Sequence, residues 1–199
     1  LFRDGTENSF PGTEGNNATA RVLSNTFFTS GIEQITGGKR AFINFTRELL
    51  IGKIPLLFPS QITTVEVLEN VIPDGPVIES CRELSGKGYT IALDDFEYTP
   101  PMEPLIEISE IIKVDFAKST REQIRAFADR FTCSGKKLLA EKVETNEEFE
   151  EALKLGYSYF QGYFFSKPQL IRRTDIPALK VNILGIMSEV GKEDYRVGT

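Results

Sequence analysis

The sequence has 199 residues, which is long enough for one sizeable hydrophobic core and short for two domains. Its 40% hydrophobic and 26% charged residues are typical of a globular protein, and no run approaches the roughly 20 apolar residues that span a bilayer. A net charge of −6 disfavours DNA or RNA as a partner. The absence of histidine excludes histidine general bases, Ser–His nucleophiles and histidine-containing zinc sites.

Cysteine usage and the start of the chain both predict a cytoplasmic protein. Cys81 and Cys133 form no CxxC pattern, so we expect packing residues in a reducing compartment and no disulfide framework. The opening residues Leu1-Phe2-Arg3-Asp4 carry charge and no apolar run follows them, so we expect no secretory signal.

Six short apolar or β-branched runs predict strands that are buried on both faces. They lie at 41–45, 63–69, 90–96, 111–116, 138–143 and 159–164. Amphipathic patterns predict helices at 18–32, 77–84, 120–131 and 145–155, the last two with caps at their first residues. This alternation predicts parallel strands with right-handed crossovers, an arrangement found in both a (β/α) barrel and a doubly wound sheet.

Two stretches are predicted to be loops, and one helix is predicted near the end of the sequence. Residues 5–17 are rich in Gly, Asn and Thr, and residues 100–104 contain three prolines, for which we expect no regular element. Residues 176–190 have the apolar stripe of an amphipathic helix.

Polar residues at or near the carboxyl ends of the predicted strands are the candidates for chemistry. They are Asn44, Glu69, Asp94, Asp95, Lys113, Asp115, Glu141 and Gln161. In a barrel these ends meet on one face, where gathered carboxylates repel one another unless a cation intervenes. An all-oxygen ligand set selects magnesium, manganese or calcium. For any single acid the alternative is a loop cap or an ion pair at the surface.

Two local features sharpen this prediction. If the strand end twists, the neighbouring acids Asp94 and Asp95 can both reach one site and serve two ions about 3.5–4 Å apart. Lys113 lies inside an apolar run, where a lone ammonium is costly without acidic partners. The alternative for Lys113 is a side chain that extends to solvent at the rim of a barrel.

Seven fragments in one order resemble the EAL domain, the (β/α)8 cyclic di-GMP phosphodiesterase module of bacterial signalling, over nearly the whole chain. They are Leu1-Phe2-Arg3 for the end of E-x-L-x-R, Phe42-Ile43-Asn44-Phe45-Thr46 for the asparagine strand, Val65-Glu66-Val67-Leu68-Glu69 for the glutamate strand, Leu93-Asp94-Asp95-Phe96 for DDFG, Ile112-Lys113-Val114-Asp115 for KID, Ala140-Glu141-Lys142-Val143-Glu144-Thr145 for AEGVET, and Gln161-Gly162-Tyr163 for QGY.

The resemblance implies a TIM-like barrel whose N-terminal part is incomplete in this chain, and a site for two Mg²⁺ or Mn²⁺ ions. The implied metal ligands are Asn44, Glu69, Asp94 and Asp95, with Asp115 at or beside the second metal. Lys113 and Glu141 would orient and deprotonate the attacking water, and Arg3 and Gln161 would contact the substrate. The implied reaction opens cyclic di-GMP to the linear dinucleotide by attack of water on phosphorus.

The sequence departs from the EAL pattern at four places. The first glutamate of the opening motif would lie two positions before Leu1. Glu97 replaces the glycine of DDFG, and a proline-rich loop follows where active members have a flexible loop that links metal binding to dimerisation. The carboxylate that anchors this loop would fall near Ile72, where there is none. Lys142 replaces the glycine of AEGVE, so its ammonium could take a cation's place or pair with Glu141.

From these departures we expect a degenerate EAL module that acts by ligand sensing or protein contacts with little hydrolysis. An active metal-dependent phosphodiesterase and a purely structural barrel are the alternatives. The substitutions resemble the subgroup in which an EAL domain precedes an HDOD domain. We therefore expect a barrel over 1–175 and a segment over 176–199 that leads to an HDOD domain. Cyclic di-GMP and the HDOD domain are the expected partners, and a homodimer is a further alternative.

Overall fold

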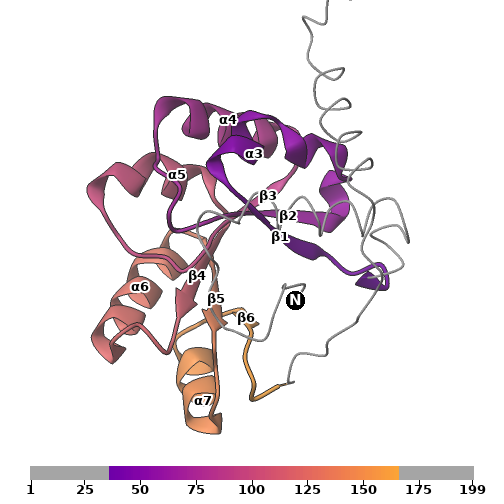
Figure 1. The fold of residues 1–199 in the computed structure, drawn as a ribbon. Coiled ribbons are helices and arrows are strands. Elements are labelled where there is room, and N and C mark those ends of the chain that lie inside the picture. The colour runs from indigo at the N-terminus through magenta and orange to yellow at the C-terminus, as the bar shows by residue number, and fades with distance from the viewer. Residues whose placement is uncertain (1–35, 166–199) are drawn as a thin grey trace, which may run out of the picture.

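The computed structural model describes residues 36–165, which build a six-stranded parallel sheet with helices packed against it (Figure 1). The strands are β1 (Ala41–Phe45), β2 (Thr63–Val67), β3 (Thr90–Leu93), β4 (Ile111–Asp115), β5 (Lys137–Glu141) and β6 (Tyr159–Phe160). Their order in the sheet is β1-β2-β3-β4-β5-β6, and each pairs in parallel with the next. All six predicted strands are present, although each strand from β2 to β6 ends earlier than predicted.

The strand order decides between the two architectures that the sequence allows. A doubly wound sheet reverses its strand order at a switch point and carries helices on both faces. Here the order follows the sequence without reversal, and the helices lie along one side of a curled sheet (Figure 1). The described residues therefore form an arc of a (β/α) barrel, as the resemblance implied.

Three of the predicted helices lie within the described residues and have defined amino-terminal caps. They are α4 (Gly75–Gly86), α6 (Arg121–Cys133) and α7 (Asn146–Lys154). The Asp74 carboxylate accepts a hydrogen bond from the Val77 N–H, and Thr120 and Thr145 each form a capping box. These caps satisfy backbone N–H groups that a helix leaves free in its first turn.

Several short helical elements were not predicted. They are α3 (Arg47–Ile51), α5 (Glu103–Ile108) and the 3-10 turns η1 (Ile54–Leu57), η2 (Ser60–Ile62) and η3 (Pro100–Met102). The expectation that the prolines of 100–104 exclude a regular element is wrong. Pro104 lies in the first turn of α5, where a missing N–H leaves no hydrogen bond unmade.

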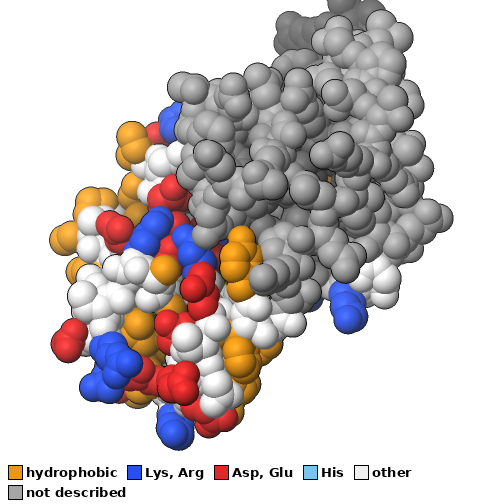
Figure 2. All heavy atoms as spheres, turned by 60° about the horizontal axis from the view of Figure 1, so that its bottom comes forward, with side chains coloured by type: hydrophobic (Ala, Val, Ile, Leu, Met, Phe, Trp, Pro, Cys, Tyr) orange, Lys and Arg blue, Asp and Glu red, His pale blue; other side chains and the backbone are white. Residues whose placement is uncertain are grey.

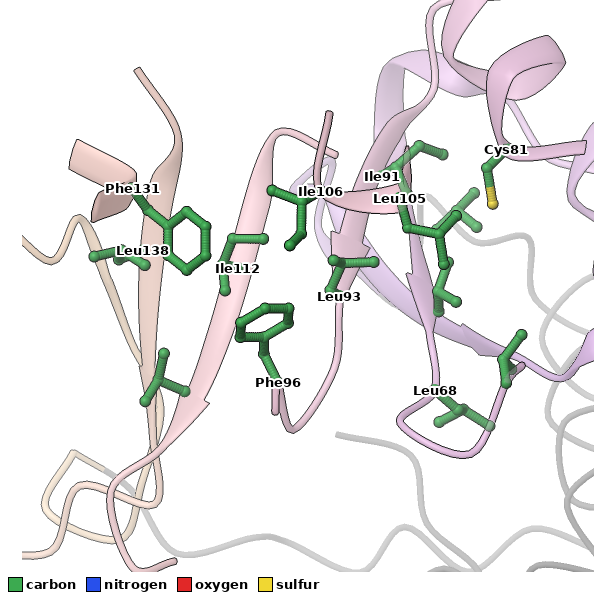
Figure 3. Packing of buried hydrophobic residues seen from close by; sticks show 14 of the residues in the cluster. Leu68, Cys81, Ile91, Leu93, Phe96, Leu105, Ile106, Ile112, Phe131 and Leu138 are labelled. Atoms are coloured by element: carbon green, nitrogen blue, oxygen red, sulfur yellow. The ribbon is translucent and has the colours of Figure 1, made fainter. Parts of the chain in front are cut away.

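The main hydrophobic core lies between the sheet and the helices. In Figure 3 the side chains of Phe96, Ile112 and Phe131 lie close together, and Leu93 and Leu105 continue the layer toward α4. Residues that alternate with these along β3, β4 and β5 point to the opposite face of the sheet. There Ala92, Ile111 and Leu139 form a second, smaller buried cluster.

Some of the predictions fall outside the described residues. They concern Arg3, the helices at 18–32 and 176–190, and the domain boundary at 175. Within 36–165, no helix is long and apolar enough to cross a membrane.

Candidate metal centre

The central residues of the site lie on the sheet face that points away from the helices. Asp94, Lys113 and Glu141 each follow by two positions a member of the small apolar cluster, namely Ala92, Ile111 or Leu139. Because side chains alternate with a period of two along a strand, each pair shares one face. The sheet thus places a charged layer directly beyond a buried apolar layer, at the carboxyl ends of the strands.

Lys113 is the centre of this charged layer. Its side chain is 4% exposed, and its Nζ lies 2.5 Å from Asp94 Oδ1 and 3.0 Å from Glu141 Oε1. It also contacts Glu66 Oε1. Burial lowers the pKa of Lys113, but the three carboxylates raise it well above that of an ordinary lysine. The acidic partners that the sequence predicted for Lys113 are therefore present, and the ammonium keeps its charge.

Glu141 has a strongly perturbed carboxyl group. The residue is 4% exposed, and burial raises the pKa of its carboxyl group to about 8, against the opposing effect of the Lys113 charge. Asp94 and Glu66 add to the increase in this pKa. Glu141 Oε2 has no hydrogen-bond partner among the described residues. A carboxyl group whose pKa lies near neutrality, with one oxygen available, suits a general base or a cation ligand.

A second group of charges surrounds Asp95 and Asp115. Lys118 Nζ donates to Asp95 Oδ2 at 2.5 Å, and Lys142 Nζ contacts Asp115 Oδ2. Burial raises the pKa of Asp95, but the Lys118 hydrogen bond and the nearby Lys142 and Lys118 charges bring it below its ordinary value. On the face that Figure 2 shows, acidic and basic side chains likewise lie interspersed. The sequence left two possibilities for the Lys142 ammonium, a cation's place or an ion pair with Glu141, and among the described residues Lys142 pairs with Asp115.

The backbone at the end of β3 explains how two adjacent acids reach one site. Consecutive strand residues face opposite sides, but β3 ends at Leu93 and Asp95 has a φ of 40°. This left-handed conformation, which is uncommon for a non-glycine residue, turns the chain at the strand end. As a result, carboxylate oxygens of Asp94, Asp95 and Glu141 lie within 4.8 Å of one another. The prediction that the strand end must turn for Asp94 and Asp95 to reach one site is confirmed.

This oxygen cluster fits a hard divalent cation. Three carboxylates converge from the end of β3 and from the end of β5, the two strands that flank β4, and the chain has no histidine that would favour zinc. Asn44 adds a buried Oδ1 that has no hydrogen-bond partner within 36–165, and it stands in register with Glu66 on the adjacent strand. Clustered carboxylates of this kind need positive charge beyond that of Lys113.

Comparison with known proteins identifies the fold family. A family model described as the EAL domain matches residues 32–168. The chain belongs to the EAL domain family. It is 37% identical over 202 residues to the Bacillus subtilis protein YuxH, which is described as uncharacterized, covering 99% of this chain and 49% of YuxH. It is 36% identical over 193 residues to the Vibrio cholerae cyclic di-GMP phosphodiesterase CdgJ, covering 96% of this chain and 45% of CdgJ.

A solved structure of the same family supports the fold. The Bacillus subtilis YkuI protein, with an EAL domain, in complex with substrate c-di-GMP and calcium, aligns with a TM-score of 0.61 at 18% identity, over 92% of this chain and 51% of that one. The described arc is thus part of an EAL barrel. The chain spans about half the length of the two curated relatives, at 49% and 45%.

The structure brings most of the predicted EAL site residues together, but Glu66 joins them in place of Glu69. Asp94, Asp95, Lys113, Asp115 and Glu141 form the two linked groups described above. Gln161 is half-buried directly after β6, and no polar contact of its side chain with the cluster is observed among the described residues. The catalytic and ligand roles of all these residues stay predictions.

The exchange concerns β2, where Glu66 joins the cluster and Glu69 does not. Glu69 is the predicted ligand because the apolar run extends the predicted strand to 69, but β2 ends at Val67 and Glu69 is exposed. Glu66 is buried within the strand, in register with Ala92 on β3. The available signal was a lone carboxylate within an apolar run, the same signal that identified Lys113.

Proposed function

We propose that this EAL domain binds cyclic di-GMP together with Mg²⁺ or Mn²⁺ and hydrolyses one of its phosphodiester bonds. The observation that carries the proposal is the buried pair of Lys113 and Glu141, 3.0 Å apart, with one Glu141 oxygen without a partner among the described residues. The similarity to the Vibrio cholerae cyclic di-GMP phosphodiesterase supports the choice of substrate.

Each residue of the cluster has a role that follows from its position. Asp94, Asp95 and Glu66, with Asn44 beside them, hold the cation, which supplies positive charge against the phosphate when it is bound. Lys113 orients the attacking water by donating a hydrogen bond. Glu141 accepts the proton of that water, for which a pKa near neutrality is suited.

The position of Glu66 removes one of the reasons for expecting little hydrolysis. In active members a carboxylate anchors the loop that follows DDF. With Glu69 as the metal ligand, this anchoring position falls near Ile72, three residues further along the chain. Counted from Glu66, the same spacing falls on Glu69, which is a carboxylate. The charge of Glu69 acts on Lys118, the partner of Asp95, which places it near the start of that loop. We therefore assign Glu69 to this anchoring position and Glu66 to the cation.

The test is an assay of cyclic di-GMP hydrolysis by the full chain, with the linear dinucleotide quantified by chromatography in the presence of Mg²⁺ or Mn²⁺. We expect metal-dependent turnover and a loss of roughly 100-fold to 10,000-fold in Glu141→Gln, the range that general-base catalysis contributes. Glu66→Gln and Glu69→Gln form a matched pair, and calorimetric titration should show weakened Mn²⁺ binding in the first only. Binding of cyclic di-GMP without any turnover would contradict the proposal.

Ligand sensing with little hydrolysis is the second candidate, and two observations favour it. The Lys142 ammonium occupies the Asp115 side of the site. Side-chain contacts of Tyr98 hold the loop that follows Asp95 against α5 and α6. Tyr98 donates a hydrogen bond to Glu103, and the Arg130 guanidinium lies 4.4 Å from the centre of the Tyr98 ring. A loop fixed in this way would couple cation binding to partner contacts differently from a flexible one. Cyclic di-GMP binding with undetectable turnover is the result that this candidate predicts.

The wider assignments extend the expectations from the sequence. We propose that residues 176–199 lead to an HDOD domain of the same protein, in keeping with relatives about twice as long as this chain. A cytoplasmic location and a homodimer belong to the same proposal. Size-exclusion chromatography with light scattering tests the homodimer directly.

A further inference from the structure

Lys142 is the residue of the site that neither the proposed reaction nor the core requires. It directly follows β5 and Glu141, and its side chain is 21% exposed. Its Nζ contacts Asp115 Oδ2 and lies 3.9 Å from Asp95 Oδ2. The ammonium therefore stands between the two carboxylates that border the Lys113 cluster.

The backbone of Lys142 is held in a conformation that a lysine does not favour. Its φ is 55°, in the left-handed region where the Cβ atom of an L-residue is crowded and where glycine is unstrained. Residues that persist in this region cluster at functional sites, because the surrounding structure must compensate for the strain. The ion pair with Asp115 is the compensation that the structure shows.

Both oxygens of Asp115 are engaged while Lys142 is in place. Its Oδ1 accepts hydrogen bonds from the backbone N–H groups of Ala117 and Lys118, at 2.8 and 3.2 Å. Its Oδ2 is in contact with the Lys142 ammonium. Glu141 differs from Asp115, because Glu141 Oε2 has no hydrogen-bond partner within the described residues. The carboxylates of Asp94 and Glu141 also lie close to that of Asp95.

The balance of charge agrees with this division. When every group is ionised, five buried or half-buried carboxylates face three ammonium groups, and one divalent ion neutralises the two negative charges in excess. The carboxylates are Glu66, Asp94, Asp95, Asp115 and Glu141, and the ammonium groups are Lys113, Lys118 and Lys142. Two divalent ions would bring excess positive charge into a site that is largely buried.

We propose that Lys142 acts as a built-in cation, so that the site binds one divalent ion per chain and the Asp115 side is filled by the ammonium. The inference rests on the proposed binding of Mg²⁺ or Mn²⁺, and it names which half of the site takes the ion. The ion is held by Asp94, Asp95 and Glu66, next to the Glu141 oxygen that has no partner among the described residues. The Lys142 ammonium supplies the positive charge on the side of Asp115.

The test measures how many Mn²⁺ ions the full chain binds in the absence of cyclic di-GMP, by calorimetric titration and by electron paramagnetic resonance. We expect one Mn²⁺ per chain in the natural sequence and in Lys142→Arg, which keeps the charge. Lys142→Gly removes the charge and the backbone strain, and Lys142→Met removes the charge alone. In Lys142→Gly and in Lys142→Met we expect a second Mn²⁺ to bind at least about 100-fold more tightly than in the natural sequence. Each variant removes a positive charge about 4 Å from where the second ion would bind.

The outcomes separate this inference from the proposed reaction. Two Mn²⁺ ions bound with similar affinity in the natural sequence, or one ion in Lys142→Gly and Lys142→Met, would overturn it. The absence of any Mn²⁺ binding would overturn it as well. One bound Mn²⁺ without turnover of cyclic di-GMP would contradict the proposed hydrolysis and leave the inference supported. Circular dichroism and thermal melts of each variant show that altered stoichiometry does not arise from unfolding.

Discussion

Replacing Lys113 by methionine should expose how much the buried cluster depends on its central charge. The Lys113 side chain is 4% exposed and contacts three carboxylates. Removing one partner of a buried ionic cluster costs about 3–5 kcal/mol, because uncompensated charges stay buried. For a chain of this size that corresponds to a fall of about 6–20 °C in the midpoint of thermal unfolding.

The loss in unfolding free energy caused by Lys113→Met should increase with pH. Without the opposing charge of Lys113, burial and the neighbouring carboxylates raise the pKa of Glu141 in the folded state further above its value in the unfolded state. A group whose folded pKa is raised is stabilised at low pH, and that stability is lost as pH rises through the folded pKa. We therefore expect the loss in unfolding free energy for Lys113→Met to be small at pH 5, larger at pH 8 and still increasing with pH above that.

The measurement is urea denaturation of the full chain at pH 5 and pH 8, with a chelator present so that no divalent ion replaces the lysine. Lys118→Met is the matched control, because this lysine also pairs with an aspartate of the site but its side chain is 58% exposed. The control should lose no more than about 1 kcal/mol. A loss below about 1 kcal/mol for Lys113→Met at pH 8, or equal losses at both pH values, would refute the reasoning.

Three further predictions concern the fold. Burial raises the pKa of the Cys81 thiol to about 12, so a thiol reagent should modify only the exposed Cys133 in the native chain and both cysteines in urea. Gly162→Ala should destabilise the chain by at least about 1–3 kcal/mol in urea denaturation, because its Cβ would lie 2.0 Å from the Val143 carbonyl oxygen. Thr145→Ala should lower the unfolding free energy by about 1 kcal/mol, since it removes the side-chain cap of α7, and Thr145→Ser should restore most of it.

The alternation of strands and helices was predictable from the sequence, but the choice of architecture was not. Periodicity identifies buried strands and amphipathic helices one at a time, and it carries no information on which strands are neighbours. The observed order, without a reversal, is what separates the barrel arc from a doubly wound sheet. The short helix α5 was missed because the prolines before it were interpreted as helix breakers, whereas Pro104 lies where a helix tolerates proline.

The site was predictable where a residue's environment followed from its own strand. Lys113 lies in the middle of an apolar run, and its need for acidic partners is met by the residues observed. Glu66 was missed because strand ends were taken as the place for chemistry, which favoured Glu69. The partner of Lys142 also differed from expectation, because its positive φ belongs to a turn that the sequence pattern does not specify and the side chain meets Asp115.

The consecutive strand order has a consequence for synthesis on the ribosome. Each strand from β2 onward pairs with the strand that directly precedes it in the chain. A nascent chain can therefore add each new strand to a partner that has already emerged, without waiting for a distant segment. The connections between paired strands are crossovers within one stretch of the sequence, and such local contacts favour fast folding. We expect the charged centre to assemble only after β5 has emerged, when Glu141 reaches a Lys113 that already contacts Glu66 and Asp94.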